Sequence, residues 1–84
     1  MYDLLSFVTR GKIRKKVLLA LQTPDTPTEI SKKILTHRST TSRTILALEE
    51  KGLVECITPK ETMGRYYQVS KMGKKILDLM EKRK

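Results

Sequence analysis

The sequence predicts a mainly helical α+β protein in which three helices are followed by two strands and a final helix. Three observations predict this order. Apolar residues recur with helical spacing through the first part of the chain, strand-forming residues flank residues 59–64, and helical spacing returns near the carboxyl end. The chain has 84 residues, which suits one domain. We therefore expect a single domain over residues 1–84, with flanking helices in residues 1–22 and 70–82.

The first part of the chain has the spacing of two short helices. Leu4, Leu5 and Val8 predict either a separate helix or an extension of the next one, with Gly11 as the expected break. Pro24 ends the second helix, because proline cannot continue the hydrogen-bond ladder. The apolar stripe of that helix consists of Ile13, Val17, Ala20 and Leu21.

Residues 26–52 contain two helices separated by a polar turn. Thr26 is the expected N-cap of the first, and Glu29 completes a Thr-x-x-Glu capping box. Ser39 is the expected N-cap of the second, which covers residues 39–51. At about 100° per residue, one narrow stripe of this helix faces the core. The stripe consists of Thr41, Ile45 and Leu48.

Residues 53–69 are predicted to form a two-stranded ribbon. Residues 53–58 and 65–69 are rich in strand formers, and the loop between them is too long for a tight hairpin. Because side chains alternate along a strand, we expect Tyr67 to face the core and Tyr66 to face outward. Beyond the ribbon, Ser70 is the expected cap of the last helix.

The composition favours a binding protein with a polyanionic partner. There are 18 Lys and Arg residues against 9 Asp and Glu residues, a formal net charge of +9. Such a charge balance favours DNA, RNA or an anionic membrane surface as the binding partner. The alternative is that the positive charge only keeps the protein soluble. One cysteine and one histidine leave too few ligands for a Cys/His metal site, so we expect neither a metal nor a cofactor. No nucleophile–base pair, carboxylate pair or phosphate-binding glycine loop indicates an enzyme. No signal peptide or membrane span is recognisable, so we expect a cytoplasmic protein.

Three segments in this order resemble winged helix-turn-helix transcriptional regulators of the MarR/ArsR-like kind. They are Ser39-Thr40-Thr41-Ser42-Arg43, Leu48-Glu49-Glu50-Lys51-Gly52-Leu53-Val54 and Gly64-Arg65-Tyr66-Tyr67-Gln68-Val69-Ser70-Lys71-Met72-Gly73. The resemblance covers about 45 residues and is moderately specific. It implies that the helix from Ser39 enters the major groove of double-stranded DNA. It also implies that the loop of the ribbon, the wing, contacts the adjacent backbone or minor groove.

Candidate DNA-contacting residues follow from this arrangement. Arg43 points away from the core stripe, and a guanidinium can donate two hydrogen bonds to a guanine edge. Hydroxyls beside it suit bases or phosphates, and basic residues flank the wing tip. The alternative for the charged members is ordinary solvated surface, and Leu46 either meets a thymine methyl or covers the domain edge. The set is Arg38, Ser39, Thr40, Ser42, Arg43, Lys60 and Arg65.

Apolar residues in the terminal segments exceed what one small core needs. We expect a homodimer through the N- and C-terminal helices, because a two-fold pair contacts two half-sites about one helical turn apart. The alternative is a monomer whose terminal helices pack on each other. These apolar residues are Leu4, Leu5, Phe7, Leu18 or Leu19, Ile76, Leu77, Leu79 and Met80.

The leading hypothesis is a sequence-specific DNA-binding transcriptional regulator. A second is a chromatin-like protein that binds DNA or RNA with little sequence preference. A third is a protein-interaction module, which would need an apolar patch on the recognition helix. The cysteine pairs or His and acidic clusters of metal-sensing ArsR proteins are missing, as are the long dimerisation helices of full MarR proteins. We therefore expect no signal sensor of either kind.

Overall fold

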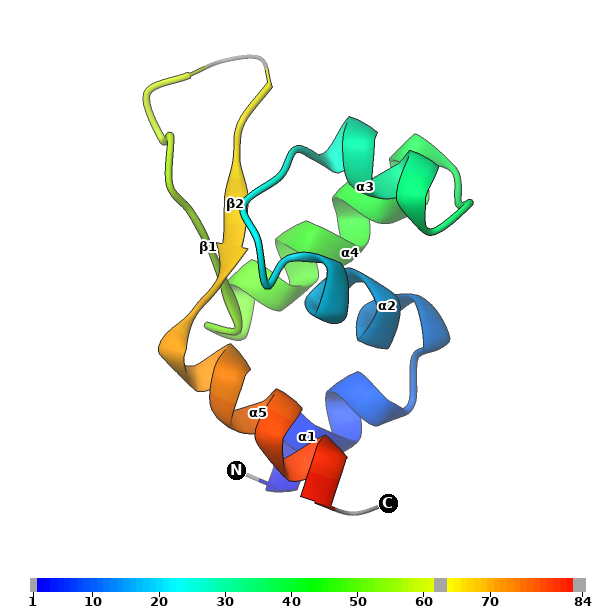
Figure 1. Ribbon diagram of the computed structural model, residues 1–84, viewed down its shortest axis with the longest axis vertical. Helices are drawn as coiled ribbons and strands as arrows, with labels where there is room; N and C mark the ends of the chain where they lie inside the picture. The colour runs from blue at the N-terminus through cyan, green and yellow to red at the C-terminus, as the bar shows by residue number, and fades with distance from the viewer. Residues whose placement is uncertain (1, 62–63, 83–84) are drawn as a thin grey trace.

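The computed structural model describes residues 2–61 and 64–82, which form helices and one antiparallel ribbon in the expected order (Figure 1). The elements are α1 (Tyr2–Thr9), α2 (Lys12–Ala20), α3 (Pro27–Lys33), α4 (Arg38–Glu50), β1 (Val54–Cys56), β2 (Tyr67–Val69) and α5 (Lys71–Lys82). The segment before Gly11 is a separate helix, which settles the alternative left open at the amino end. Figure 1 shows α1 and α5 side by side at one end of the molecule, and the loop of the ribbon at the other.

The core lies where α2, α4 and the ribbon meet, and α1 and α5 close it. Thr41, Ile45 and Leu48 are buried, as the helical spacing predicted. The Thr41 hydroxyl donates to the carbonyl oxygen of His37 at 3.0 Å, so its burial leaves no unsatisfied polar atom. Tyr67 is buried as well, whereas Tyr66 is exposed. The inner side of α4 is therefore fixed by packing, and its outer side remains available.

The start of α4 differs from the prediction: the helix begins one residue earlier and its N-cap lies two residues earlier. The helix begins at Arg38, its N-cap is His37, and the predicted cap Ser39 already lies inside the first turn. The carbonyl oxygen of His37 accepts the Thr41 N–H at 3.0 Å. The preceding turn is tight because Leu35 adopts a positive φ of 56°. This turn sets where α4 begins, and no side chain caps it.

The carboxyl end of α4 follows the prediction. Gly52 has φ 77°, a conformation that glycine adopts without steric cost. Its N–H donates to Glu49 O at 2.9 Å, and the N–H of Leu53 donates to Leu48 O at 2.9 Å. This pair of bonds is a Schellman motif, which satisfies the last carbonyls of the helix. It directs the chain straight into β1.

Helix α5 is anchored at its first turn to the start of β1. The Ser70 hydroxyl accepts the Gly73 N–H at 3.1 Å, as expected of an N-cap, and donates to Gly52 O at 2.6 Å. The Ser70 N–H donates to Leu53 O at 2.9 Å. These bonds place the backbone of α5 directly against the exit from α4.

The ribbon is shorter than predicted. Val54 pairs with Val69 and Cys56 pairs with Tyr67, so each strand has three residues. Beyond them, the Tyr66 N–H donates to the Thr58 hydroxyl at 2.9 Å rather than to a backbone carbonyl. The Ile57 N–H still donates to Tyr66 O at 2.9 Å, so the Thr58 side chain replaces one backbone acceptor of the ladder while the two arms stay joined.

A third stretch of chain pairs with the outer edge of β2. Asp25 and Tyr67 exchange backbone hydrogen bonds of 3.1 and 2.9 Å, and the Val69 N–H donates to Leu21 O at 2.8 Å. The segment that leads into α3 is thereby held beside the wing. Thr26 caps α3 as predicted, because its hydroxyl accepts the Glu29 N–H at 3.3 Å.

Asp25 forms an ion pair with Lys33 on α3, with 2.6 Å between Oδ2 and Nζ. This hydrogen bond holds the pKa of the Asp25 carboxyl below its ordinary value of 3.8. The ionised carboxyl therefore stabilises the folded state fully above pH 3.8, and this contribution is lost as the pH falls through 3.8 toward the lower folded-state pKa.

We expect Asp25→Asn to reduce the loss of unfolding free energy that occurs as the pH falls below 5, which is the acid limb of the stability curve. Asparagine keeps an acceptor for the Thr26 N–H, which Asp25 Oδ1 accepts at 2.9 Å, and removes only the charge. Urea unfolding between pH 5 and pH 3 would measure the effect. Lys33→Met should flatten the acid limb less than Asp25→Asn does, because the Thr26 N–H still favours the ionised carboxyl. If wild type and both variants lose stability in parallel on acidification, the pair does not contribute.

Much of the apolar excess in the terminal segments is buried within the single chain. Leu5, Leu18, Ile76 and Leu77 are buried in the core cluster, and Leu4, Phe7, Leu79 and Met80 pack partly against it. Leu19, by contrast, is 50% exposed. The alternative in which the terminal helices pack on each other thus accounts for most of these residues. Within the described ranges, no helix has both the length and the apolar character required to cross a membrane.

Candidate nucleic-acid interface

The outer side of α4 is polar and accessible. Arg38, Ser39 and Arg43 are exposed, and Thr40 and Ser42 are half-buried. Ser39 and Arg43 lie opposite the buried stripe, whereas Arg38, Thr40 and Ser42 flank it. Leu46 shares this side and is 54% exposed. Small residues at the start of such a helix allow it to approach a groove closely.

Arg43 is oriented along the helix rather than away from it. Its Nε donates to Ser39 O at 3.4 Å, a long contact that leans the guanidinium toward the amino end of α4. Thr44 bonds back to Thr40 O at 2.8 Å, so its hydroxyl is occupied by the helix. The Arg43 guanidinium therefore lies over the first turns of α4, near Ser39.

The wing carries two exposed basic side chains, Lys60 and Arg65, on its two arms. Lys60 lies in the turn between Thr58 and Glu61, which a hydrogen bond of 3.1 Å from Glu61 N to Thr58 O closes. Arg65 lies on the returning arm, and its Nε donates to Glu61 O at 2.6 Å. Lys60 thus lies on the outgoing arm of the wing, whereas Arg65 lies on the returning arm and lines a pocket with residues of α3 and α4.

The structure brings three of the predicted contact residues together at one pocket. Arg38 and Ser42 on α4 and Arg65 on the wing line an open pocket of about 250 Å³. Its remaining lining comes from the wing and from the start of α3, and consists of Thr26, Pro27, Thr28, Gly64 and Tyr67. Sequence reasoning assigned Thr26 a capping role alone and did not consider Thr28. The Asp25–Tyr67 pairing that places both beside the wing has no local sequence signature.

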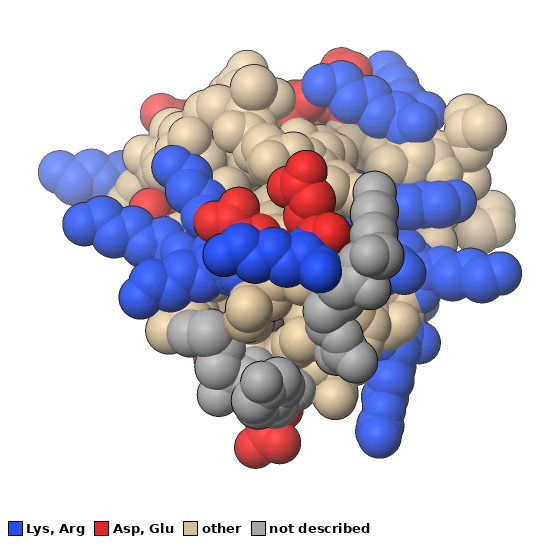
Figure 2. Space-filling view, turned by 60° about the horizontal axis from the view of Figure 1, so that its bottom comes forward, with Lys and Arg blue, Asp and Glu red and all other residues tan. Residues whose placement is uncertain are grey.

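The charges are unevenly distributed over the molecule. Figure 2 shows the end that carries α1 and α5, where acidic side chains gather in the middle and basic side chains surround them. Asp78 and Glu81 on α5 are exposed. In the basic run of residues 10–16, Arg14 has a structural role, since its guanidinium stacks 4.0 Å from the Phe7 ring and donates to Phe7 O at 2.7 Å. Acidic side chains therefore form part of the surface at this end of the molecule.

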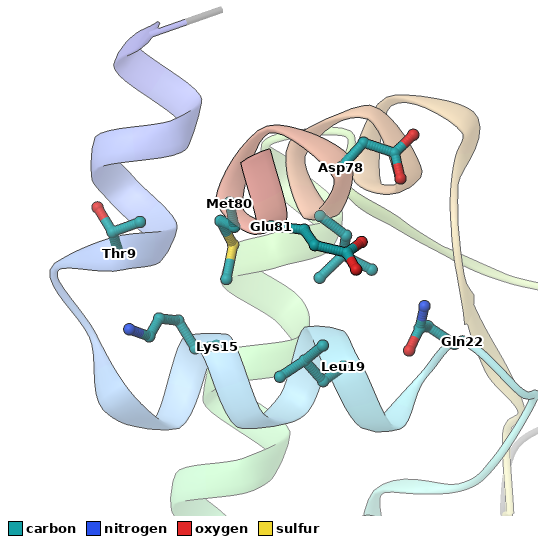
Figure 3. Close-up of a pocket in the computed structure, with 8 residues that line it drawn as sticks. Thr9, Lys15, Leu19, Gln22, Asp78, Met80 and Glu81 are labelled. Carbon is teal, nitrogen blue, oxygen red and sulfur yellow. The ribbon is translucent and has the colours of Figure 1, made fainter. Parts of the chain in front are cut away.

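A second hollow, of about 730 Å³, lies between α2 and α5. In Figure 3, Leu19 on α2 and Met80 on α5 point into the space between the two helices. Lys15 lines the α2 side, and Asp78 and Glu81 line the α5 side. The walls of this groove are thus apolar in the middle and oppositely charged at their rims.

Metal-ligating side chains are not gathered anywhere in the part of the chain that the structure describes. No group of three or more His, Cys, Asp or Glu residues there is arranged to hold an ion. Cys56 is a free, half-buried thiol at the end of β1. The site is therefore composed of guanidinium, ammonium and hydroxyl groups.

The arrangement of elements is that of a winged helix-turn-helix protein. No protein-family model matches the sequence, and no curated protein is detectably similar to it. Two solved structures share the fold. One is a possible transcriptional regulator for arsenical resistance, with a TM-score of 0.72, 22% identity, and coverage of 94% of this chain and 81% of that one. The other is a MarR family transcription regulator, with a TM-score of 0.65, 22% identity, and coverage of 96% of this chain and 64% of that one.

Proposed function

We propose that this protein is a transcriptional regulator that binds double-stranded DNA sequence-specifically. Helix α4 enters the major groove, and the wing lies on the adjacent backbone or minor groove. The observation that carries the proposal is the outer side of α4, where Ser39, Ser42 and Arg43 are accessible above the buried Thr41, Ile45 and Leu48. The proteins of the same fold named above are described as transcriptional regulators.

Affinity and specificity come from different residues in this proposal. Arg38, Lys60 and Arg65 contact phosphates, and the net charge of +9 attracts the duplex. Ser39, Thr40, Ser42 and Arg43 contact bases. The action is binding without catalysis, and it takes place in the cytoplasm at the nucleoid.

The deciding experiment is selection of bound duplexes from a random pool, followed by affinity measurements over a range of salt concentrations. We expect one enriched motif, and a binding constant that falls as salt rises with a slope of about −0.9 per phosphate contacted. An unenriched pool that still binds in low salt would favour the chromatin-like alternative. No binding to any duplex would point to a protein-interaction module.

We further propose that two copies associate through the amino-terminal helices α1 and α2 and the carboxyl-terminal helix α5. Leu19 remains 50% exposed beside the α2–α5 groove, and the basic and acidic rims of that groove allow a second copy to place opposite charges together. A two-fold dimer would contact an inverted repeat. Sedimentation equilibrium measures this directly, and Leu19→Glu should shift the equilibrium toward monomer. A monomer at all concentrations, with a selected motif that is not repeated, would contradict the dimer.

A further inference from the structure

The pocket between α3, α4 and the wing has the composition of an anion site. Its charged lining consists of Arg38 and Arg65, which are 27 positions apart and come from different elements. None of the described residues that line it is acidic. Guanidinium groups present several donors in a plane and suit phosphate oxygens.

No acidic residue of the described ranges forms an ion pair with either arginine. Within residues 2–61 and 64–82, the ion pairs join Lys32 to Glu29 and Lys33 to Asp25, and neither involves Arg38 or Arg65. Asp25, just before the pocket, is engaged by Lys33 and by the Thr26 N–H. Two unpaired guanidinium groups that line one small pocket repel each other, and a bound anion removes this repulsion.

Hydroxyl groups complete the lining. Thr26 uses its oxygen to accept the Glu29 N–H, which leaves its O–H free to donate. In the part of the chain that the structure describes, the Thr28 and Ser42 hydroxyls form no hydrogen bond. The residues that line this open space of about 250 Å³ therefore include three with hydroxyl groups and two with guanidinium groups.

The surrounding backbone holds these groups in place. The Asp25–Tyr67 pairing joins the start of α3 to β2, and the bond from Arg65 Nε to Glu61 O fixes the near end of that guanidinium. Arg38 and Ser42 are one turn apart on α4. Such preorganisation lowers the entropy lost when a ligand binds.

We propose that this pocket binds a single backbone phosphate of the duplex, held by Arg38 and Arg65 together. The inference rests on the proposed function. A helix in the major groove and a wing in the next groove have one strand of phosphates between them, and the pocket lies between α4 and the wing. The phosphate held there fixes the angle of α4 in its groove, so Arg65 acts at the backbone rather than in the minor groove.

The test is a double-mutant cycle on the full chain, measured as duplex affinity at fixed salt. We expect Arg38→Gln and Arg65→Gln each to weaken binding about tenfold. The double variant should also lose about tenfold, because either loss disables the same contact. Lys60→Gln is the matched control. Its loss of affinity should multiply with the loss caused by Arg38→Gln or by Arg65→Gln, because Lys60 contacts a different phosphate. A loss of about a hundredfold in the double variant would overturn the shared site.

Neutral methylphosphonates placed one at a time along the duplex identify the phosphate. A methylphosphonate at one position should weaken duplex binding by the wild-type chain about tenfold and leave binding by the double variant unchanged. Competition by inorganic phosphate beyond that of chloride at equal ionic strength, lost in the double variant, would instead assign the pocket to a free anion and overturn the backbone assignment. If the wild-type chain binds duplex but every sensitive position is equally sensitive in the double variant, the pocket fails and the proposed function stands. If it binds no duplex, both fail.

Discussion

Replacement of Gly73 by alanine should destabilise the protein by about 2 kcal/mol or more, although alanine is the better helix former. A Cβ at this position of α5 would overlap the carbonyl oxygen of Leu53 and Cγ2 of Val69. The Leu53 oxygen cannot move away freely, because it accepts the Ser70 N–H at 2.9 Å. The gain of about 1 kcal/mol in helix propensity is therefore outweighed by backbone overlap.

Thermal unfolding followed by circular dichroism measures the effect. A loss of this size lowers the midpoint by roughly 8–16 °C in a domain of this length. Lys75→Ala, on the exposed side of the same helix, is the control and should change the midpoint little. Gly52→Ala offers a second comparison, because its Cβ meets nothing within 4 Å and its cost is the strain of positive φ alone, about 1–2 kcal/mol. A Gly73→Ala protein as stable as wild type would refute the close packing of α5 on the start of β1.

Arg43→Ala should weaken binding to the selected duplex by about 1–3 kcal/mol, which is about 5- to 150-fold. The loss should concentrate at one base position, because a guanidinium that donates to a guanine edge distinguishes that base from the others. Arg43 is exposed and lies on the outer side of α4, so its removal leaves the core intact.

Binding curves with the selected duplex, its single-base variants and a scrambled duplex provide the measurement. Lys60→Gln is the matched control, since it removes one exposed charge from the wing. It should weaken all duplexes uniformly and reduce the salt slope by about 1. Equal losses on selected and scrambled DNA for Arg43→Ala would contradict base contact by this residue.

Side-chain periodicity predicted the inner side of the interface correctly. Thr41, Ile45 and Leu48 are buried because a helix repeats every 3.6 residues and places them on one stripe. Tyr67 is buried and Tyr66 exposed because a strand alternates. These assignments depend on local geometry, which the order of the residues specifies directly.

Element boundaries were predicted less well, because several local signals compete. Ser39 is a good cap by residue type, yet the left-handed Leu35 turns the chain early and makes His37 the N-cap. The strands were predicted too long because the Thr58 hydroxyl takes the N–H of Tyr66 from the ladder. The local sequence does not distinguish such alternative boundaries well, since their free energies differ by about the contribution of one hydrogen bond.

The sequence by itself determined the order of the elements, the buried stripe of α4, the cap of α3 and the glycine that ends α4. Each depends on residues within a few positions of one another. Tertiary structure alone decided which distant residues meet. It packed Leu5 and Leu18 with Ile76 in one core, and it brought Arg38 and Arg65 to the pocket where we place a phosphate. The physical reason is the pairing of Asp25 with Tyr67 and the docking of α5 on Leu53, which are long-range backbone contacts and leave no periodic trace in the chain.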